Sequence, residues 1–157
     1  MQSASSAWAV EGLAGPVVLT VSSRQRDSQR DGQRTSPTQF DMAALASLPQ
    51  TGYTTHTPWY SQPRKFTGPL LRDVLASAGV HGSQLRLVAL NDYRVDLPFD
   101  DVLQHEVLLA RLMDDKPMAV RDKGPLFVIY PFDQHAALRN AVYYSRCAWQ
   151  LRAIDVL

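Results

Sequence analysis

The apolar residues of this chain are grouped in short runs, and this grouping limits the folds that the chain can adopt. Short β-branched or aliphatic runs beside glycine, proline or aspartate predict strands. The predicted strands are Pro16 to Val21, Leu85 to Leu90, Tyr93 to Leu97, Val107 to Met113, Leu126 to Tyr130 and Cys147 to Val156, with the polar, β-prone Gly52 to Trp59 beside them. The chain has no regular alternation of strand and helix and no glycine-rich phosphate loop. We therefore predict an α+β fold around a mixed β-sheet core with short helices.

Helical periodicity is confined to short segments. The clearest helix follows Gly68 and Pro69, shows one apolar stripe and ends at Gly79, a residue that favours the left-handed C-terminal stop. Its stripe consists of Leu70, Leu71, Val74, Leu75 and Ala78. A second helix is predicted from Met42, capped by Asp41 and ended by Pro49, and a third from Phe99 to His105 behind Pro98.

Size and charge indicate one ordinary domain. The 157 residues predict a single domain over residues 1–157, with a polar loop at about residues 22–38. A net charge of +1 gives no general attraction to nucleic acid or to anionic membranes. The apolar runs are far shorter than the roughly 20 residues that cross a bilayer, so no membrane insertion is expected. The single cysteine, Cys147, excludes an internal disulfide.

Several enzyme classes are excluded by the absence of their residue patterns. A hydrolase needs a nucleophile beside its base, and the sequence has no nucleophile elbow. The histidines are scattered singly, which does not fit zinc-ligand spacing. The carboxylate pairs Asp100-Asp101 and Asp114-Asp115 are adjacent in sequence, so the members of each pair point apart.

Three segments contain more polar and aromatic side chains than folding requires. They are Thr51 to Phe66, Asn91 to Tyr93, and Arg121 to Pro125 together with Tyr143 to Arg146. Rings that stack, carboxylates for ring amino groups and cations for phosphate indicate binding of a planar, polar, anionic small molecule. Structural roles stay open as well: a hairpin turn at residues 91–92, a solvated turn at residues 121–123, and a hydrogen-bonded structural role for His56.

Four segments in order resemble molybdopterin-binding domains of the sulfite-oxidase type. They read FTGPLLRDVLASAGV, VALNDYRVDLPFDD, LLARLMDDKPMAVRDKGPLFVIYP and YYSRCAWQLRAIDV, and the likeness covers Phe66 to Val156 well and Asp41 to Tyr60 weakly. In that family the fold holds a pterin cofactor in a polar cleft, and the enzymes ligate molybdenum through a cysteine shortly before the first segment. Here that stretch reads TTHTPWYSQPRKF, with Thr57 or a neighbour at the cysteine position.

Two departures from the family pattern argue against oxidation chemistry. A threonine hydroxyl does not replace a thiolate as a soft metal ligand, and Cys147, predicted in the final strand, is assigned to packing. Family enzymes carry a histidine and an arginine around their glycine-proline turn, whereas here the turn is Asp122-Lys123-Gly124-Pro125, with Phe127 near the arginine position. No molybdenum and no catalytic residue are therefore expected.

The resemblance implies a pterin cleft formed by the polar segments. Trp59 or a tyrosine is expected to stack on the ring, Asp92 or Asp122 to accept its N–H groups, and Arg64, Lys123 or Arg146 to meet a phosphate or ring carbonyl. The predicted binding residues are Tyr53, Thr55, His56, Thr57, Trp59, Arg64, Asn91, Asp92, Tyr93, Arg121, Lys123, Tyr144, Ser145 and Arg146.

Short members without the cysteine resemble periplasmic pterin-binding regulators, which signal through a membrane-bound enzyme that makes or degrades cyclic diguanylate. We therefore predict a non-catalytic periplasmic protein that binds a pterin, which can be a reduced pterin. We also predict that it contacts the extracytoplasmic domain of that membrane protein. Residues 1–10 show no signal-peptide pattern. Because a periplasmic protein is exported, its signal peptide is expected to have been removed. The alternatives are a molybdopterin oxidoreductase with atypical metal ligation and a pure interaction module. Candidate partner surfaces are the arginine-rich loop Arg24 to Arg34 and the mouth of the pocket.

Overall fold

The structure is a computed structural model that describes residues 13–23 and 37–157. The arginine-rich loop Arg24 to Arg34 lies outside the described residues. The chain is built around a five-stranded sheet, in which β1 and β11 are parallel and every other neighbouring pair is antiparallel. The strand order is β2 (Thr38–Asp41), β1 (Val17–Ser23), β11 (Leu151–Val156), β5 (Gln84–Ala89) and β6 (Arg94–Pro98). The predicted mixed sheet and α+β class are confirmed.

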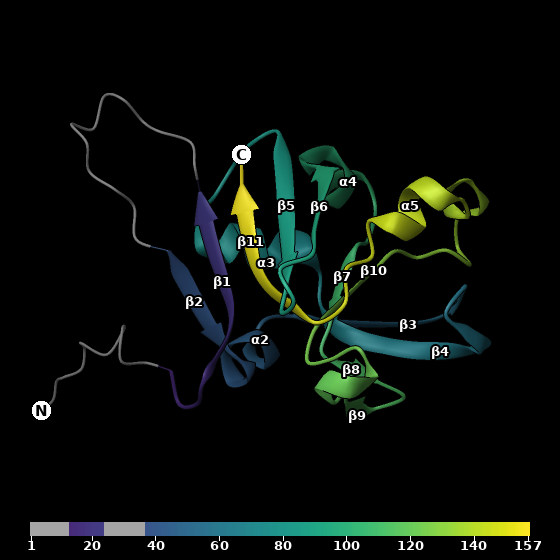
Figure 1. Ribbon diagram of the computed structural model, residues 1–157, viewed down its shortest axis with the longest axis horizontal. Helices are drawn as coiled ribbons and strands as arrows, with labels where there is room; N and C mark the ends of the chain where they lie inside the picture. Colours follow the sequence, from purple (N-terminus) through teal and green to yellow (C-terminus); the bar gives the residue numbers. More distant parts are fainter. Residues whose placement is uncertain (1–12, 24–36) are drawn as a thin grey trace, which may run out of the picture.

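Two smaller sheets lie beside the first (Figure 1). The four-stranded sheet has the order β3 (Gln50–Thr57), β4 (Tyr60–Pro69), β8 (Leu112–Met113) and β9 (Lys116–Pro117). The two-stranded sheet pairs β10 (Phe127–Ile129) with β7 (Leu108–Ala110). An isolated bridge from Phe127 to Trp149 joins β10 to the segment that leads into β11. This bridge brings the end of the chain against the smaller sheets.

The helices are short, as the sequence predicts. Within residues 13–23 and 37–157 they are α2 (Met42–Ser47), α3 (Leu71–Ala78), α4 (Phe99–Gln104) and α5 (Ala141–Ser145), with 3₁₀ turns at Val120–Asp122 and Ala136–Leu138. The Asp41 carboxylate caps α2 by accepting from the N–H of Ala44, and Gly79 ends α3 at φ 70°. No helix in the described ranges is long and apolar enough to span a membrane.

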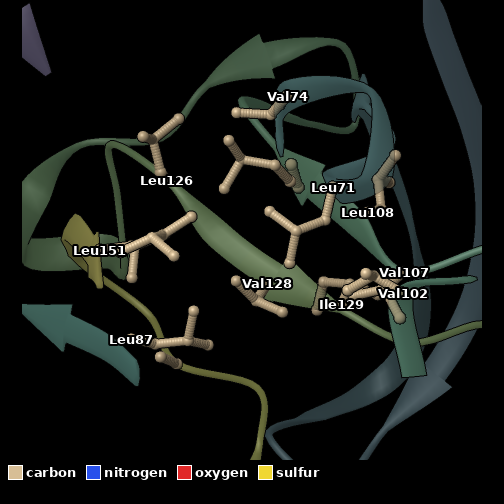
Figure 2. Close-up of a cluster of buried hydrophobic side chains, with 14 of the residues drawn as sticks. Leu71, Val74, Leu87, Val102, Val107, Leu108, Leu126, Val128, Ile129 and Leu151 are labelled. Atoms are coloured by element: carbon tan, nitrogen blue, oxygen red, sulfur yellow. The ribbon is translucent and has the colours of Figure 1, made fainter. Parts of the chain in front are cut away.

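The hydrophobic core joins α3 to the sheets. Leu71 of α3 points toward Val128 of β10, and Val74 and Ile129 belong to the same cluster (Figure 2). The cluster continues to Leu87 and Leu151 of the five-stranded sheet. These leucines are fully buried. Fully burying one such aliphatic side chain contributes about 1.5–3 kcal/mol. The core therefore fixes β10 between α3 and the end of the chain.

Two strand predictions are wrong in detail. The predicted strand from Val107 to Met113 is divided into β7 and β8, which belong to different sheets. The division occurs at Arg111, whose N–H donates to the carbonyl of Thr67 in β4. A continuous apolar run cannot reveal such a division, because its residues suit burial in either sheet.

The final strand is shorter than predicted. β11 begins at Leu151, and Cys147 lies before it, in the connection after α5. Helix α5 itself was not predicted, although Asn140 caps it by accepting from the N–H groups of Val142 and Tyr143. Its five residues are too few to show a helical apolar stripe.

Candidate ligand-binding pocket

A pocket of about 470 Å³ opens where α5, the β5–β6 turn and the β3–β4 turn meet. Its size is within the range of small-molecule sites. The lining residues are Trp59, Ala89, Asn91, Tyr93, Tyr144, Ser145, Cys147, Ala148, Trp149 and Gln150. The segment from Tyr144 to Gln150 therefore supplies more than half of the lining, and the two hairpin turns and Ala89 at the end of β5 supply the rest.

Aromatic rings form one wall of the pocket. The centre of the Trp59 ring lies 6.2 Å from that of Tyr144 and 5.7 Å from that of Trp149, both in edge-to-face arrangements. Trp59 also packs on the buried ring of Phe127 at 5.5 Å, which holds the indole in place. Trp149 keeps 38% of its surface exposed and Tyr93 keeps 52%. These two rings leave aromatic surface open for a flat ligand.

A cation lies against this wall. Lys123 Nζ is 4.6 Å from the centre of the Trp149 ring and 5.7 Å from that of Tyr60. Lys123 has φ 76°, in the left-handed region, at the end of the 3₁₀ turn. The N–H of Gln150 donates to the Lys123 carbonyl at 3.0 Å, so the lysine turn is joined to the pocket lining.

The polar side chains of the lining are uncharged, and they include the amides of Asn91 and Gln150 and the hydroxyl of Ser145. Asn91 Oδ1 accepts from the N–H of Tyr93 at 3.1 Å, which leaves the Asn91 amide N–H groups as donors. Gln150 Nε2 donates to the carbonyl of Val120 at 2.7 Å, which leaves Oε1 as an acceptor. Ser145 Oγ donates to the Val142 carbonyl at 2.7 Å and retains acceptor lone pairs. The side chains can therefore meet both donors and acceptors on a ring edge.

Cys147 belongs to the lining but not to a reactive site. Its side chain is buried, and Sγ lies 3.6 Å from the Tyr143 carbonyl. Burial raises the pKa of the thiol far above its ordinary value, so the group stays protonated at neutral pH. A thiol is a weak nucleophile compared with a thiolate, so this cysteine has no reactive character in the structure.

Sequence comparison identifies the domain type. The profile of the oxidoreductase molybdopterin-binding domain family matches residues 28–137. The chain belongs to this family. The matched residues include the pocket residues from Trp59 to Tyr93, whereas the wall from Tyr144 to Gln150 lies beyond the match. No curated protein matches the sequence.

The fold of this molybdopterin-binding domain is similar to a solved enzyme structure. A chain of the sulfane dehydrogenase SoxCD from Paracoccus pantotrophus superposes with a TM-score of 0.63 at 16% sequence identity. The match covers 88% of this chain and 37% of the SoxCD chain. This chain thus spans little more than a third of the length of that relative, and at this identity the likeness shows the fold alone.

The side chains around the pocket suit the pterin ring of the family cofactor better than its metal. Thr57, near the expected cysteine position, has a buried hydroxyl with no hydrogen-bond partner among the described residues. A neutral hydroxyl there is a poor donor for molybdenum, and Cys147 lies after α5 rather than at the expected ligand position. No group of three or more His, Cys, Asp or Glu residues with metal-binding geometry occurs in ranges 13–23 and 37–157.

Five predicted binding residues meet at the pocket, and a sixth lies against it. Trp59, Asn91, Tyr93, Tyr144 and Ser145 line the pocket, and Lys123 contacts the Trp149 ring. The pocket also contains residues that the prediction left out, above all Trp149 and Gln150. Their signal in the sequence was a tryptophan three residues after the Tyr143–Arg146 segment. It was missed because the residues were predicted to continue a buried strand.

The predicted residues of β3 lie outside the pocket lining. Tyr53 is buried, and its hydroxyl donates to the Glu106 carbonyl at 2.8 Å and lies 3.0 Å from the Ile129 carbonyl. Burial raises the pKa of Tyr53 well above its ordinary value. Thr55 Oγ1 accepts from the N–H of Asp133, and His56 Nδ1 lies 2.8 Å from the Asp133 carboxylate. These contacts agree with the structural alternative for His56.

The predicted charged residues are mostly paired elsewhere. Arg64 contacts Asp114 at 3.0 Å and covers the Tyr60 ring, and Asp92 pairs with Arg152 at 2.6 Å. The Arg152 guanidinium lowers the pKa of Asp92. Arg146 pairs with Asp101 at 2.6 Å. Arg121 is exposed in the 3₁₀ turn, and Asp122 follows it there. None of these residues lines the pocket.

Proposed function

We propose that this domain binds a pterin in the pocket between Trp59, Tyr93 and Trp149. The observation that carries the proposal is the wall of tryptophan and tyrosine rings beside uncharged amide groups. A pterin is a flat, electron-poor ring with donors and acceptors along one edge. Stacking on an aromatic ring contributes about 0.5–1.5 kcal/mol beyond the area buried. The Asn91 and Gln150 amides supply complementary hydrogen bonds for the ring edge.

We further propose that the domain uses the pterin as a signal rather than as a redox cofactor. The threonine at or near the position expected for the metal-ligating cysteine supports this role. The sequence resemblance to periplasmic regulators suggests the setting: a periplasmic protein whose partner is the extracytoplasmic domain of a membrane-bound cyclic-diguanylate cyclase or phosphodiesterase. Ligand binding would change the surface offered to that partner.

Titration calorimetry with a reduced pterin tests the binding proposal. The parent protein is expected to bind one pterin per chain, and Trp59→Ala to bind it at least about tenfold more weakly. Leu103→Ala is a matched control, because Leu103 is an exposed apolar residue of α4 outside the pocket lining. A parent protein that binds no pterin, or equal weakening in both variants, contradicts the proposal.

The signalling proposal is tested separately by co-purification with the periplasmic domain of a membrane cyclase or phosphodiesterase encoded beside this gene. Complex formation should depend on added reduced pterin and should be lost in Trp59→Ala. Identical complex formation with and without the pterin would contradict the signalling role. It would leave the binding result unaffected.

A molybdopterin oxidoreductase with atypical ligation is the second candidate. The observation that favours it is the position of Cys147, which belongs to the wall of the same pocket as Trp59. The structural relative from Paracoccus pantotrophus is itself named as a dehydrogenase. Metal analysis, described among the predictions below, separates this candidate from the pterin-binding regulator.

A further inference from the structure

A buried polar network lies directly behind the pocket wall. The guanidinium of Arg146, at the C-terminal end of α5, donates to Asp101 Oδ2 of α4 at 2.6 Å. The hydroxyl of Tyr130 donates to the same oxygen at 2.7 Å. Only 20% of the Arg146 side chain and 10% of the Asp101 side chain are exposed. Tyr130 is fully buried. The network thus joins α5 to α4 and to the end of β10.

Aromatic contacts restrict the network further. The Arg146 guanidinium lies 5.1 Å from the centre of the Tyr143 ring, and that ring packs against Tyr130 at 5.6 Å. Burial and the neighbouring carboxylate both raise the pKa of Tyr130, so its hydroxyl stays a donor. A buried ion pair is weak evidence for added stability, because desolvation offsets its attraction. Its clearest effect is to fix where its partners lie.

Apart from this network, helix α5 contacts the core through two partly buried rings. The Tyr143 ring packs on Tyr130, and the Tyr144 ring packs on Phe132. The helix spans five residues, and none of them is fully buried. Yet Tyr144 and Ser145 of α5, and Cys147 one residue beyond Arg146, supply lining of the pocket. A helix without a buried apolar face depends on its polar and partly buried contacts for position.

We propose that Arg146, Asp101 and Tyr130 form a positioning network that holds the Tyr144–Cys147 wall of the pocket closed. The network acts through the wall, since neither Arg146 nor Asp101 lines the pocket. Opening of the Tyr144–Cys147 wall would expose the Cys147 thiol and distort the ligand site. The effect on ligand affinity rests on the proposed pterin binding, whereas the effect on the thiol does not.

The thiol supplies a direct readout, because Cys147 is the single cysteine of the chain and is buried. The rate of its reaction with an aromatic disulfide reagent measures how often the wall opens. Asp101→Asn and Arg146→Gln are expected to increase this rate about tenfold or more, which corresponds to about 1.4 kcal/mol in the opening equilibrium. Arg146→Lys keeps the charge and should restore part of the protection. Asp96→Asn is the matched control, because Asp96 forms a more exposed ion pair with Arg86 on the β5–β6 hairpin.

Global unfolding is separated from local opening by measuring the free energy of unfolding of each variant in urea. The proposal requires the thiol to react faster than global unfolding alone allows. If the rates in Asp101→Asn and Arg146→Gln follow the unfolding constant, or equal those of Asp96→Asn, the network is merely structural and the proposal is overturned. If a variant does not fold, Tyr130→Phe, which removes only the hydroxyl, should still increase the rate; an unchanged rate there overturns the proposal.

Calorimetry with a reduced pterin tests the effect of the network on ligand affinity. The same substitutions should weaken binding, with Arg146→Lys intermediate and Asp96→Asn at the parent affinity. Unchanged affinity in variants with an accelerated thiol would overturn the link between the network and the ligand site. A parent protein that binds no pterin would contradict the proposed function, and the thiol rates would then decide the positioning role alone.

Discussion

The ammonium group of Lys123 lies 4.6 Å from the centre of the Trp149 ring, at the aromatic wall of the pocket. Trp149 faces the pocket with part of its surface exposed, and the lysine covers one part of the ring. Arg64 and Arg146, the other cations predicted to meet the ligand, are paired with Asp114 and Asp101. Lys123 is therefore the predicted cation best placed to meet a charged group on a ligand.

Replacing Lys123 by a neutral residue should weaken binding of a charged ligand more than binding of an uncharged one. Lys123→Gln is expected to weaken binding of a pterin phosphate about tenfold, because it removes a charge-assisted contact. Binding of the same pterin without its phosphate should change little. Calorimetry with the two ligands measures the difference. Equal losses for both would show that Lys123 supports the aromatic wall rather than a phosphate.

Removal of the second tryptophan should be as damaging as removal of the first. Trp149→Ala deletes a ring that packs on Trp59 and Phe127, so we expect reduced-pterin affinity to fall at least about tenfold. Tryptophan fluorescence during pterin titration gives the dissociation constant. Val142→Ala serves as a comparison, because Val142 is exposed on α5 outside the pocket lining. Parent affinity in Trp149→Ala would exclude this wall from the binding site.

Metal content should separate the regulator from the oxidoreductase. The single cysteine, Cys147, lies after α5 and not in the stretch before Phe66 where the resemblance places the metal ligand, so we expect no stoichiometric molybdenum after expression in a host that makes the cofactor. Elemental analysis of the purified protein measures the content, and about one molybdenum per chain would refute the expectation. Cys147→Ser should still bind a reduced pterin, because the buried thiol is assigned to packing and its contact with the Tyr143 carbonyl can also be made by a serine hydroxyl.

The cap of α2 should make stability depend on pH in acid. Hydrogen bonds from the N–H groups of Ala44 and Gly15 lower the pKa of Asp41 below the ordinary value of 3.8. The unfolded chain then binds the proton first as the pH falls. The stabilisation is fully present above that ordinary value and is lost as the pH drops through the lower folded-state pKa. Urea unfolding between pH 5 and about pH 2.5 should show a shallower decline for Asp41→Asn than for the parent. Identical pH profiles would contradict this account of the cap.

Gly68 should tolerate no side chain. A Cβ at this position would collide with the carbonyl of Leu109, because β4 approaches β7 closely there. We expect Gly68→Ala to lower the free energy of unfolding by about 1–3 kcal/mol through overpacking. Gly15→Ala is the control, since its Cβ would meet only Asp41 Oδ2 at an ordinary 3.9 Å. Equal stability of the two variants in urea would show that the strands can separate without cost.

Local patterns determined the parts of this fold that the sequence predicts correctly. The apolar stripe of α3 and its stop at Gly79, the Asp41 cap of α2, and the hairpin around Asn91 all depend on residues a few positions apart. Propensity, capping and turn chemistry act over that range, so they can be read without knowledge of the rest of the chain. The family resemblance added the expectation of a pterin cleft, and five of the predicted residues line the observed pocket.

The tertiary structure alone decided which side chains share the pocket. Trp149 meets Trp59 because the chain after α5 forms a bridge with Phe127 of β10, a contact that no local pattern indicates. In the sequence, Arg146 and Asp92 are both candidates for binding a ligand. In the fold, Arg146 pairs with Asp101, and Asp92 pairs with Arg152. A charged side chain bonds to whichever opposite charge the packing brings within reach, and packing of segments distant in sequence depends on the whole core.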